Sequence, residues 1–191
     1  MVATVGYIGK IKYAPGTFGS LVAFPLCYII MYFTFNNQII FPINGLSIVE
    51  QSFITLLIIE LSAILILFII GTYCTRCYIE NLDNKDPKEV VIDEVVGQML
   101  VINLCSMSIV MLLDTKLKDY MNGSTIDFIF LFLSPFILFR LFDIFKPWPI
   151  NWLDKNIKGA LGVMIDDVAA AIFAIIAHYV MIFILLDFYA K

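Results

Sequence analysis

Five long apolar stretches constrain this chain more than any other feature of its sequence. They cover residues 20–35, 53–71, 94–113, 126–145 and 168–188. A helix of about 20 apolar residues crosses a bilayer, and a composition of 61% hydrophobic and 15% charged residues lies far from that of an ordinary soluble domain. The sequence therefore predicts an all-α integral membrane protein, with about five transmembrane helices in one bundle and residues 1–191 forming a single domain. Asn36, Asn37 and Gln38 interrupt the first stretch, which leaves open whether it crosses fully.

The basic residues are unevenly distributed between the two sides that five crossings define. One side receives nine of the twelve lysines and arginines, namely Lys10, Lys12, Arg76, Lys85, Lys88, Arg140, Lys146, Lys155 and Lys158. The other side receives Lys116, Lys118 and Lys191. Because segments rich in lysine and arginine stay in the cytoplasm, we expect the first side to be cytoplasmic. It also carries most of the unusual polar segments, so we expect the active site at the cytoplasmic interface. No basic cluster with interleaved aromatic residues indicates a nucleic acid partner.

Two pairs of adjacent carboxylates stand beside apolar stretches on this side. Asp93 and Glu94 occur in VIDEVVGQML, and Asp166 and Asp167 occur in GALGVMIDD. We expect each pair in the first turn of a helix, where a carboxylate contributes about 0.3–1 kcal/mol, so capping alone would explain one pair. Two pairs with Asp143 nearby place much like charge close to a low dielectric, which is costly unless it is neutralised. These five acids are the predicted catalytic residues, and the two pairs are the predicted ligands of Mg²⁺, which binds carboxylate oxygens together with substrate phosphate.

Arg140, Asp143 and Lys146 follow one another at intervals of three residues. On a helix, residues at this spacing share one face. The pattern is typical of an interfacial anchor, whose cations reach toward lipid headgroups. It is equally typical of a phosphate clamp, in which arginine offers a fork of donors and lysine a point charge. Arg140 and Lys146 are therefore candidate phosphate-binding residues.

Thr17 and Ser20 lie in APGTFGS, where the first apolar stretch begins. The exposed backbone amides at the start of a helix can bind a phosphate. A turn followed by a helix N-cap would explain the same residues. Both alternatives stay open, and Thr17 and Ser20 are further candidates for phosphate binding.

The sequence lacks suitably placed nucleophilic residues for the histidine-based and cysteine-based phosphatase mechanisms. The single histidine, His178, lies mid-way along the fifth stretch, about 15 Å or more from the charged side at a rise of 1.5 Å per residue. None of the four cysteines has an arginine six residues later, and the CxxC spacing in CTRC lacks the other two ligands of a zinc site. The remaining phosphatase mechanism is metal-assisted attack of water on phosphorus.

Glu60 lies inside the apolar sequence LLIIELSAIL. An ionisable residue within a membrane segment is a functional candidate, and together with the acidic pairs it supports a second hypothesis, a small ion or metal transporter. Most of the acids lie at one interface, however, and Glu60 could instead pair with a polar residue of another helix. A third hypothesis is another Mg²⁺-dependent lipid enzyme, such as a CDP-alcohol phosphotransferase, although the longer aspartate motif of that family is missing.

Four segments resemble, in order, the signature blocks of the phosphatidylglycerophosphatase A family of bacterial lipid phosphatases. They are APGTFGSL (14–21), VVIDEVVGQ (90–98), FRLFDIFKPWPI (139–150) and GALGVMIDDVAAA (159–171). The resemblance implies Mg²⁺-dependent hydrolysis of phosphatidylglycerophosphate to phosphatidylglycerol and phosphate, at the cytoplasmic face of the bacterial inner membrane. It also implies that the two acidic pairs bind metal or activate water, and that Arg140, Asp143 and Lys146 face the phosphate.

Overall fold

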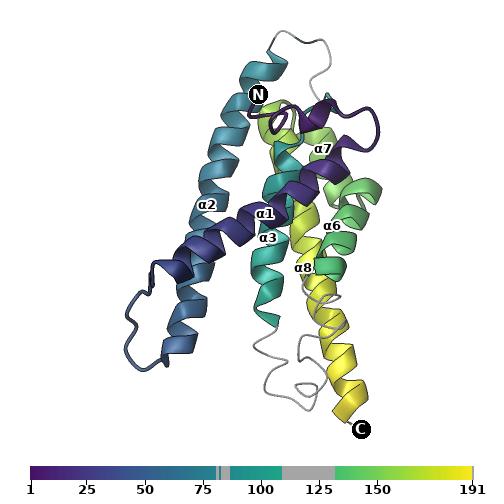
Figure 1. Ribbon diagram of the computed structural model, residues 1–191. Coiled ribbons are helices and arrows are strands. Elements are labelled where there is room, and N and C mark those ends of the chain that lie inside the picture. Colours follow the sequence, from purple (N-terminus) through teal and green to yellow (C-terminus); the bar gives the residue numbers. More distant parts are fainter. Residues whose placement is uncertain (81, 83–86, 109–131, 191) are drawn as a thin grey trace.

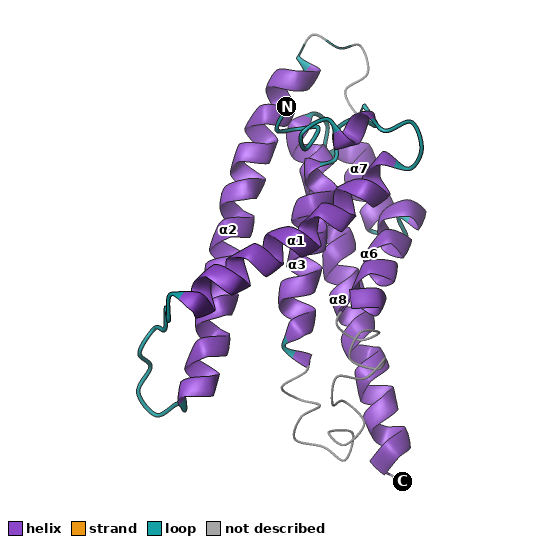
Figure 2. Cartoon of the chain, viewed as in Figure 1, coloured by secondary structure: helices purple, strands orange, loops and turns teal. Residues whose placement is uncertain are grey.

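The computed structural model describes residues 1–80, 82, 87–108 and 132–190. Within these residues the protein contains six α-helices and the short 3-10 helix η1 (Ile8–Lys10), and no strand (Figure 2). The α-helices are α1 (Pro15–Asn36), α2 (Ile48–Ile79), α3 (Ile92–Ser106), α6 (Ser134–Phe145), α7 (Ile150–Asn156) and α8 (Ala160–Ala190). The predicted all-α class is confirmed.

Three of these helices are long and apolar enough to cross a membrane. The candidate spans are Pro15–Asn36, Ile48–Ile79 and Ala160–Asp187. Helices α3 and α6 contain 15 and 12 residues within the described part of the chain. The stretches 94–113 and 126–145, which predicted two further crossings, continue into residues 109–131, outside the described residues. The chain is thus a membrane protein with three candidate spans, and five crossings stay a prediction.

Three of the helices, α1, α2 and α8, begin five or more residues before the apolar stretches that predicted them. Helix α2 starts at Ile48 because Ser47 and Glu50 form a capping box, in which each side chain bonds to the other residue's backbone amide. Helix α8 starts at Ala160, directly after Gly159, whose φ of +78° suits a turn. Asp166 and Asp167 consequently lie roughly two turns inside α8. The prediction that they occupy its first turn was wrong, since hydropathy marks only the most apolar part of a helix.

Helices α3 and α8 pack against each other at the centre of the bundle (Figure 1). Helices α1 and α2 pack on α3, while α6 and α7 pack on α8, and α1 crosses the others obliquely. Within lipid, helices associate through close contact of small residues more than through the hydrophobic effect. A Cβ atom at Gly97 of α3 would lie 2.6 Å from the Phe139 ring and 3.1 Å from the backbone oxygen of Asp167. Glycine at this position therefore allows α3, α6 and α8 to meet beside the acidic residues.

Candidate active site

A cavity of about 370 Å³ lies where α1, α3, α6 and α8 meet. Eight of the nine site residues predicted from the sequence line it, namely Thr17, Asp93, Glu94, Arg140, Asp143, Lys146, Asp166 and Asp167. The ninth, Ser20, is fully buried and does not line the cavity. The fold thus brings together residues from four segments that are far apart in the sequence, although their chemical roles stay predictions.

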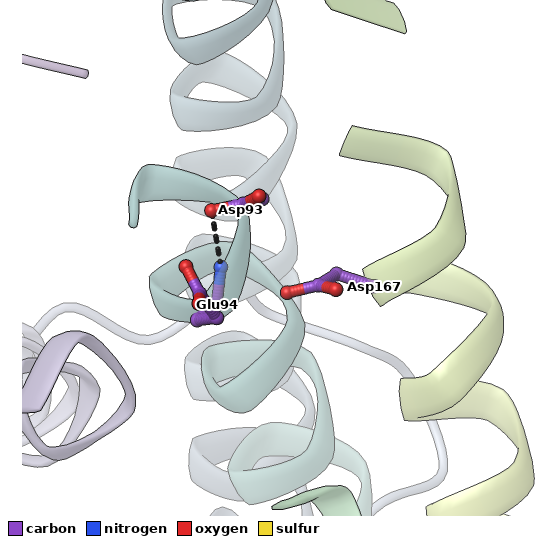
Figure 3. Close-up of side chains that lie close together, drawn as sticks. All are labelled: Asp93, Glu94 and Asp167. Carbon is purple, nitrogen blue, oxygen red and sulfur yellow. Dashed lines mark hydrogen bonds between the residues drawn. The ribbon is translucent and has the colours of Figure 1, made fainter. Parts of the chain in front are cut away.

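Three carboxylates from two helices converge at this cavity (Figure 3). One oxygen from each of Asp93, Glu94 and Asp167 lies within 4.8 Å of the other two. Asp93 and Glu94 occupy the first turn of α3, as predicted, and Asp93 accepts a hydrogen bond of 3.0 Å from the Glu94 backbone amide. Asp167 reaches across from α8 (Figure 3). Asp166, the fourth predicted metal ligand, is not part of this triplet.

The triplet has the chemistry of a binding site for a hard divalent cation. Glu94 Oε2 and Asp167 Oδ2 are buried and have no hydrogen-bond partner among the described residues. Buried carboxylate oxygens without partners are costly, and oxygen donors are the ligands that Mg²⁺ and Ca²⁺ prefer. Burial, followed by the charge of Glu94 and then that of Asp167, raises the pKa of Asp93 well above its ordinary value. A bound cation would remove this repulsion, so these residues fit such an ion.

Arg140 is fixed in the cavity wall by two partners. Its Nη1 atom lies 2.6 Å from Asp143 Oδ2, one turn further along α6, which agrees with the prediction that these two residues share a helix face. The same nitrogen donates a hydrogen bond of 3.3 Å to Ser20 Oγ. Ser20 in turn donates to the Gly16 carbonyl at 2.9 Å. Ser20 therefore contacts the guanidinium and holds it against α1.

Lys146 does not continue the helical face of Arg140 and Asp143, and that part of the prediction was wrong. Helix α6 ends at Phe145, and Lys146 is its C-cap residue in the left-handed conformation, with φ +41°. The turn directs its ammonium group to Asp166 on α8 and to Asp154 on α7, with 3.1 Å between Nζ and Asp154 Oδ1. Burial disfavours the charged form, but these ion pairs outweigh it and raise the pKa of Lys146 above its ordinary value.

The APGTFGS segment forms the start of α1 and not a turn that precedes it. Pro15 is the first helical residue, and the N-cap residue Ala14 makes no side-chain cap. A Cβ atom at Gly16 would overlap the Glu94 carboxylate and lie 3.1 Å from an Arg140 nitrogen. Because Ala14 is the N-cap residue, the alternative of a turn followed by a Ser or Thr N-cap is wrong. The absence of a side chain at Gly16 lets α1 contact the charged residues directly.

The isolated polar residues of the apolar stretches lie apart from this cavity. Glu60 is buried and accepts a hydrogen bond of 2.7 Å from Asn103 Nδ2, so the alternative that it pairs with another helix is confirmed. His178 lies between the hydroxyl groups of Ser108 and Ser134, each 3.0 Å from a ring nitrogen. All four cysteines are free. None of these residues lines the cavity.

Three residues near the site were missed in the sequence. Lys88 lines the cavity, Asp154 contacts Lys146, and both amide atoms of Gln98 are buried without a partner among the described residues. Gln98 could have been found, because it follows Glu94 by four residues and so lies on the same face of α3. Nothing in the local sequence marks Asp154, since its contact depends on the turn at Lys146.

Comparisons with known proteins point to one family. A family model described as Phosphatidylglycerophosphatase A matches residues 1–182. Phosphatidylglycerophosphatase A of Escherichia coli is 26% identical over 158 residues, which cover 83% of this chain and 68% of that protein. The Haemophilus influenzae protein of the same name is 51% identical over 47 residues, which cover 25% of this chain and 29% of that protein. A Bacteroides thetaiotaomicron protein named "Putative phosphatidylinositol-3-phosphatase" is 30% identical over 168 residues, covering 88% of this chain and 83% of the relative. No solved structure matches the chain significantly.

Proposed function

The chain belongs to the phosphatidylglycerophosphatase A family and is accordingly a phosphatase of phospholipid metabolism, and from this premise we propose that it hydrolyses phosphatidylglycerophosphate to phosphatidylglycerol and inorganic phosphate with Mg²⁺. One observation carries the proposal. The carboxylates of α3 and α8 and the cations Arg140 and Lys146 line the same cavity. A site for hydrolysis of a phosphate monoester needs both, because a metal ion and basic side chains neutralise the phosphoryl group together.

We propose that the whole chain, residues 1–191, is one domain of five crossings in the bacterial inner membrane, with the cavity on the cytoplasmic side. The match of the family model over residues 1–182 supports the single domain. The excess of lysine and arginine on the side of the cavity supports its orientation. The matched relatives are bacterial proteins, which agrees with this location. In this arrangement a lipid headgroup reaches the cavity while the acyl chains stay in the bilayer.

We assign Mg²⁺ binding to Asp93, Glu94 and Asp167, with Asp166 as an adjacent fourth ligand. The close approach of the first three and the unpartnered buried oxygens of Glu94, Asp166 and Asp167 support this assignment. When bound, the ion would supply Lewis acidity at the phosphoryl oxygens.

The basic residues bind and orient the phosphate in this proposal. Arg140 offers its fork of donors and Lys146 a point charge, and Thr17 lines the same cavity at the start of α1. Ser20 serves phosphate binding through Arg140, to which it is bonded. With the phosphate held, its phosphorus atom is exposed to attack by a water molecule on the side opposite the glycerol oxygen.

Hydrolysis forms a bond between the water oxygen and phosphorus and breaks the bond between phosphorus and the glycerol oxygen. The water proton needs an acceptor, and the departing alkoxide needs a proton. We assign the transfer from the water to Asp143, the predicted catalytic acid outside the four proposed ligands, which Arg140 holds in the cavity wall. The departing alkoxide takes its proton from solvent water, to which Asp143 later releases the proton it accepted.

The test is phosphate release by the purified protein in lipid nanodiscs. We expect release from phosphatidylglycerophosphate with Mg²⁺ and none with EDTA, and Asp93→Asn should abolish it. Phosphate release that persists both in EDTA and in Asp93→Asn would contradict the proposed mechanism. Parallel reactions with phosphatidic acid and phosphatidylinositol 3-phosphate test the substrate, because faster hydrolysis of either would replace the proposed one.

A further inference from the structure

Lys146 is shared by two carboxylates that come from different helices. Asp166 on α8 lines the cavity, whereas Asp154 on α7 does not. The side chain of Asp166 is 6% exposed, that of Lys146 26% and that of Asp154 36%. The ammonium group therefore lies between a buried partner inside the site and a more exposed partner outside it.

The geometry leaves room for a ligand on the ammonium group. A lysine has three N–H donors and no acceptor. Asp166 Oδ2 and Asp154 Oδ1 accept two of them, so the third is available to a phosphate in the cavity that Lys146 lines. Lys146 can bind substrate without giving up either carboxylate.

The contact with Asp166 is the one that the proposed chemistry disturbs. Asp166 is the proposed fourth metal ligand, and its hold on Lys146 weakens when it binds the ion. A lysine side chain is a flexible four-carbon stem with a strongly hydrated end. Held by Asp166 alone, the ammonium would turn toward solvent when Asp166 engages another partner.

We propose that Asp154 is a positioning residue that keeps the Lys146 ammonium in the cavity throughout turnover; this inference rests on the proposed function. Helix α7, which carries Asp154, is held in place by its own contacts. Ile150 at the start of α7 is fully buried, its amide donates to the Pro147 carbonyl at 2.8 Å, and α7 packs against α8. Asp154 acts through Lys146 and does not touch the substrate.

A merely structural role would give a different result. If the ion pair only tied α7 to the end of α6, Asp154→Asn would lower thermal stability and leave the affinity for phosphate unchanged. A positioning role predicts weaker phosphate binding at unchanged thermal stability, and no further loss of affinity once Lys146 is gone. A double-mutant cycle measured on phosphate affinity, with Tm recorded for each variant, separates the two.

The experiment compares Asp154→Asn, Lys146→Ala and the double variant in nanodiscs, with Lys155→Gln, an exposed residue of the same helix, as the matched control. A partly exposed ion pair supports an increase of about fivefold in KM and in the dissociation constant of inorganic phosphate for Asp154→Asn, with kcat changing less. Lys146→Ala should raise both by about 10- to 100-fold, and the double variant should match it. Asp154→Glu should restore part of the loss, and Lys155→Gln should behave as the wild type.

Two results would overturn the inference. One is an unchanged KM and phosphate affinity in Asp154→Asn, and the other is a double variant whose losses multiply. A wild-type protein that releases no phosphate would instead contradict the proposed function. The affinity for inorganic phosphate, read from thermal shifts, would still test the inference in that case.

Discussion

Replacing Asp167 with asparagine should make the protein more stable and inactive at once. The substitution keeps the size of the side chain and removes one of three negative charges whose oxygens lie within 4.8 Å of one another. Without a metal ion those charges repel across the contact between α3 and α8. The variant lacks part of this repulsion, so its free energy of unfolding should be higher. With Mg²⁺ present the same charge becomes a ligand, so the variant loses binding.

The size of both effects can be worked out from the separation. Two unit charges 4.8 Å apart repel by about 3 kcal/mol at an effective dielectric constant of about 20. Asp93, whose pKa is raised, relieves part of this by binding a proton. We therefore expect a gain of about 1 kcal/mol in the free energy of unfolding in EDTA, or roughly 2–4 °C in Tm for a domain of this size. Loss of a metal ligand should lower kcat/KM by at least about 100-fold.

The assay is thermal unfolding in EDTA and in Mg²⁺, together with phosphate release. Mg²⁺ at 100 times its dissociation constant should stabilise the wild type by about 2.7 kcal/mol, and most of this gain should be missing in Asp167→Asn. Asp187→Asn, an exposed position on the same helix, is the control and should keep both the stabilisation by Mg²⁺ and the release of phosphate. A variant that is less stable than the wild type in EDTA, or that keeps its stabilisation by Mg²⁺, would refute the reasoning.

Three further predictions follow from neighbouring features. Gly16→Ala should lower kcat/KM by about 10-fold or more, because its Cβ would displace the Glu94 carboxylate; unchanged kinetics would show that α1 moves aside. Glu60→Gln should keep phosphatase activity within about twofold and give no change in metal flux in proteoliposomes, since Asn103 already satisfies this residue; loss of a measurable flux would favour a transporter. In EDTA the folded protein retains on Asp93 a proton that the unfolded chain releases, so Tm should fall as the pH rises above about 4, and Asp93→Asn should weaken this dependence; a Tm that rises with pH would contradict the shift.

The parts of the site that the sequence predicted correctly are those set by local pattern. Asp93 and Glu94 begin α3 because the apolar run that follows them is helical, and both features are visible in a few consecutive residues. The three-residue spacing of Arg140 and Asp143 likewise becomes a salt bridge within one helix. Such relations need only the helical repeat, which a short segment contains in full.

The parts that were wrong or missed depend on where helices end and on which helices meet. Lys146 leaves the face of Arg140 because it adopts a left-handed conformation, which the sequence KPWP does not specify on its own. Its contact with Asp154 exists only because of that turn. The partner of Glu60 could not be named either, because Asn103 lies on another helix and the sequence does not fix how α2 and α3 are rotated against each other.

The contacts that hold this bundle together also set the distances within its site. Gly97 lies one turn after Asp93 on α3 and closely approaches both Phe139 and the backbone of Asp167. A side chain there would push α8 away from α3 at the level of the triplet and separate Asp167 from the carboxylates it faces. Because helices in lipid gain little from burying apolar area, the same small residues that permit close packing determine whether three oxygens can share one ion. Close helix packing and metal binding therefore both depend on Gly97 at this end of the protein. The sequence alone shows the glycine but not the residues that it contacts.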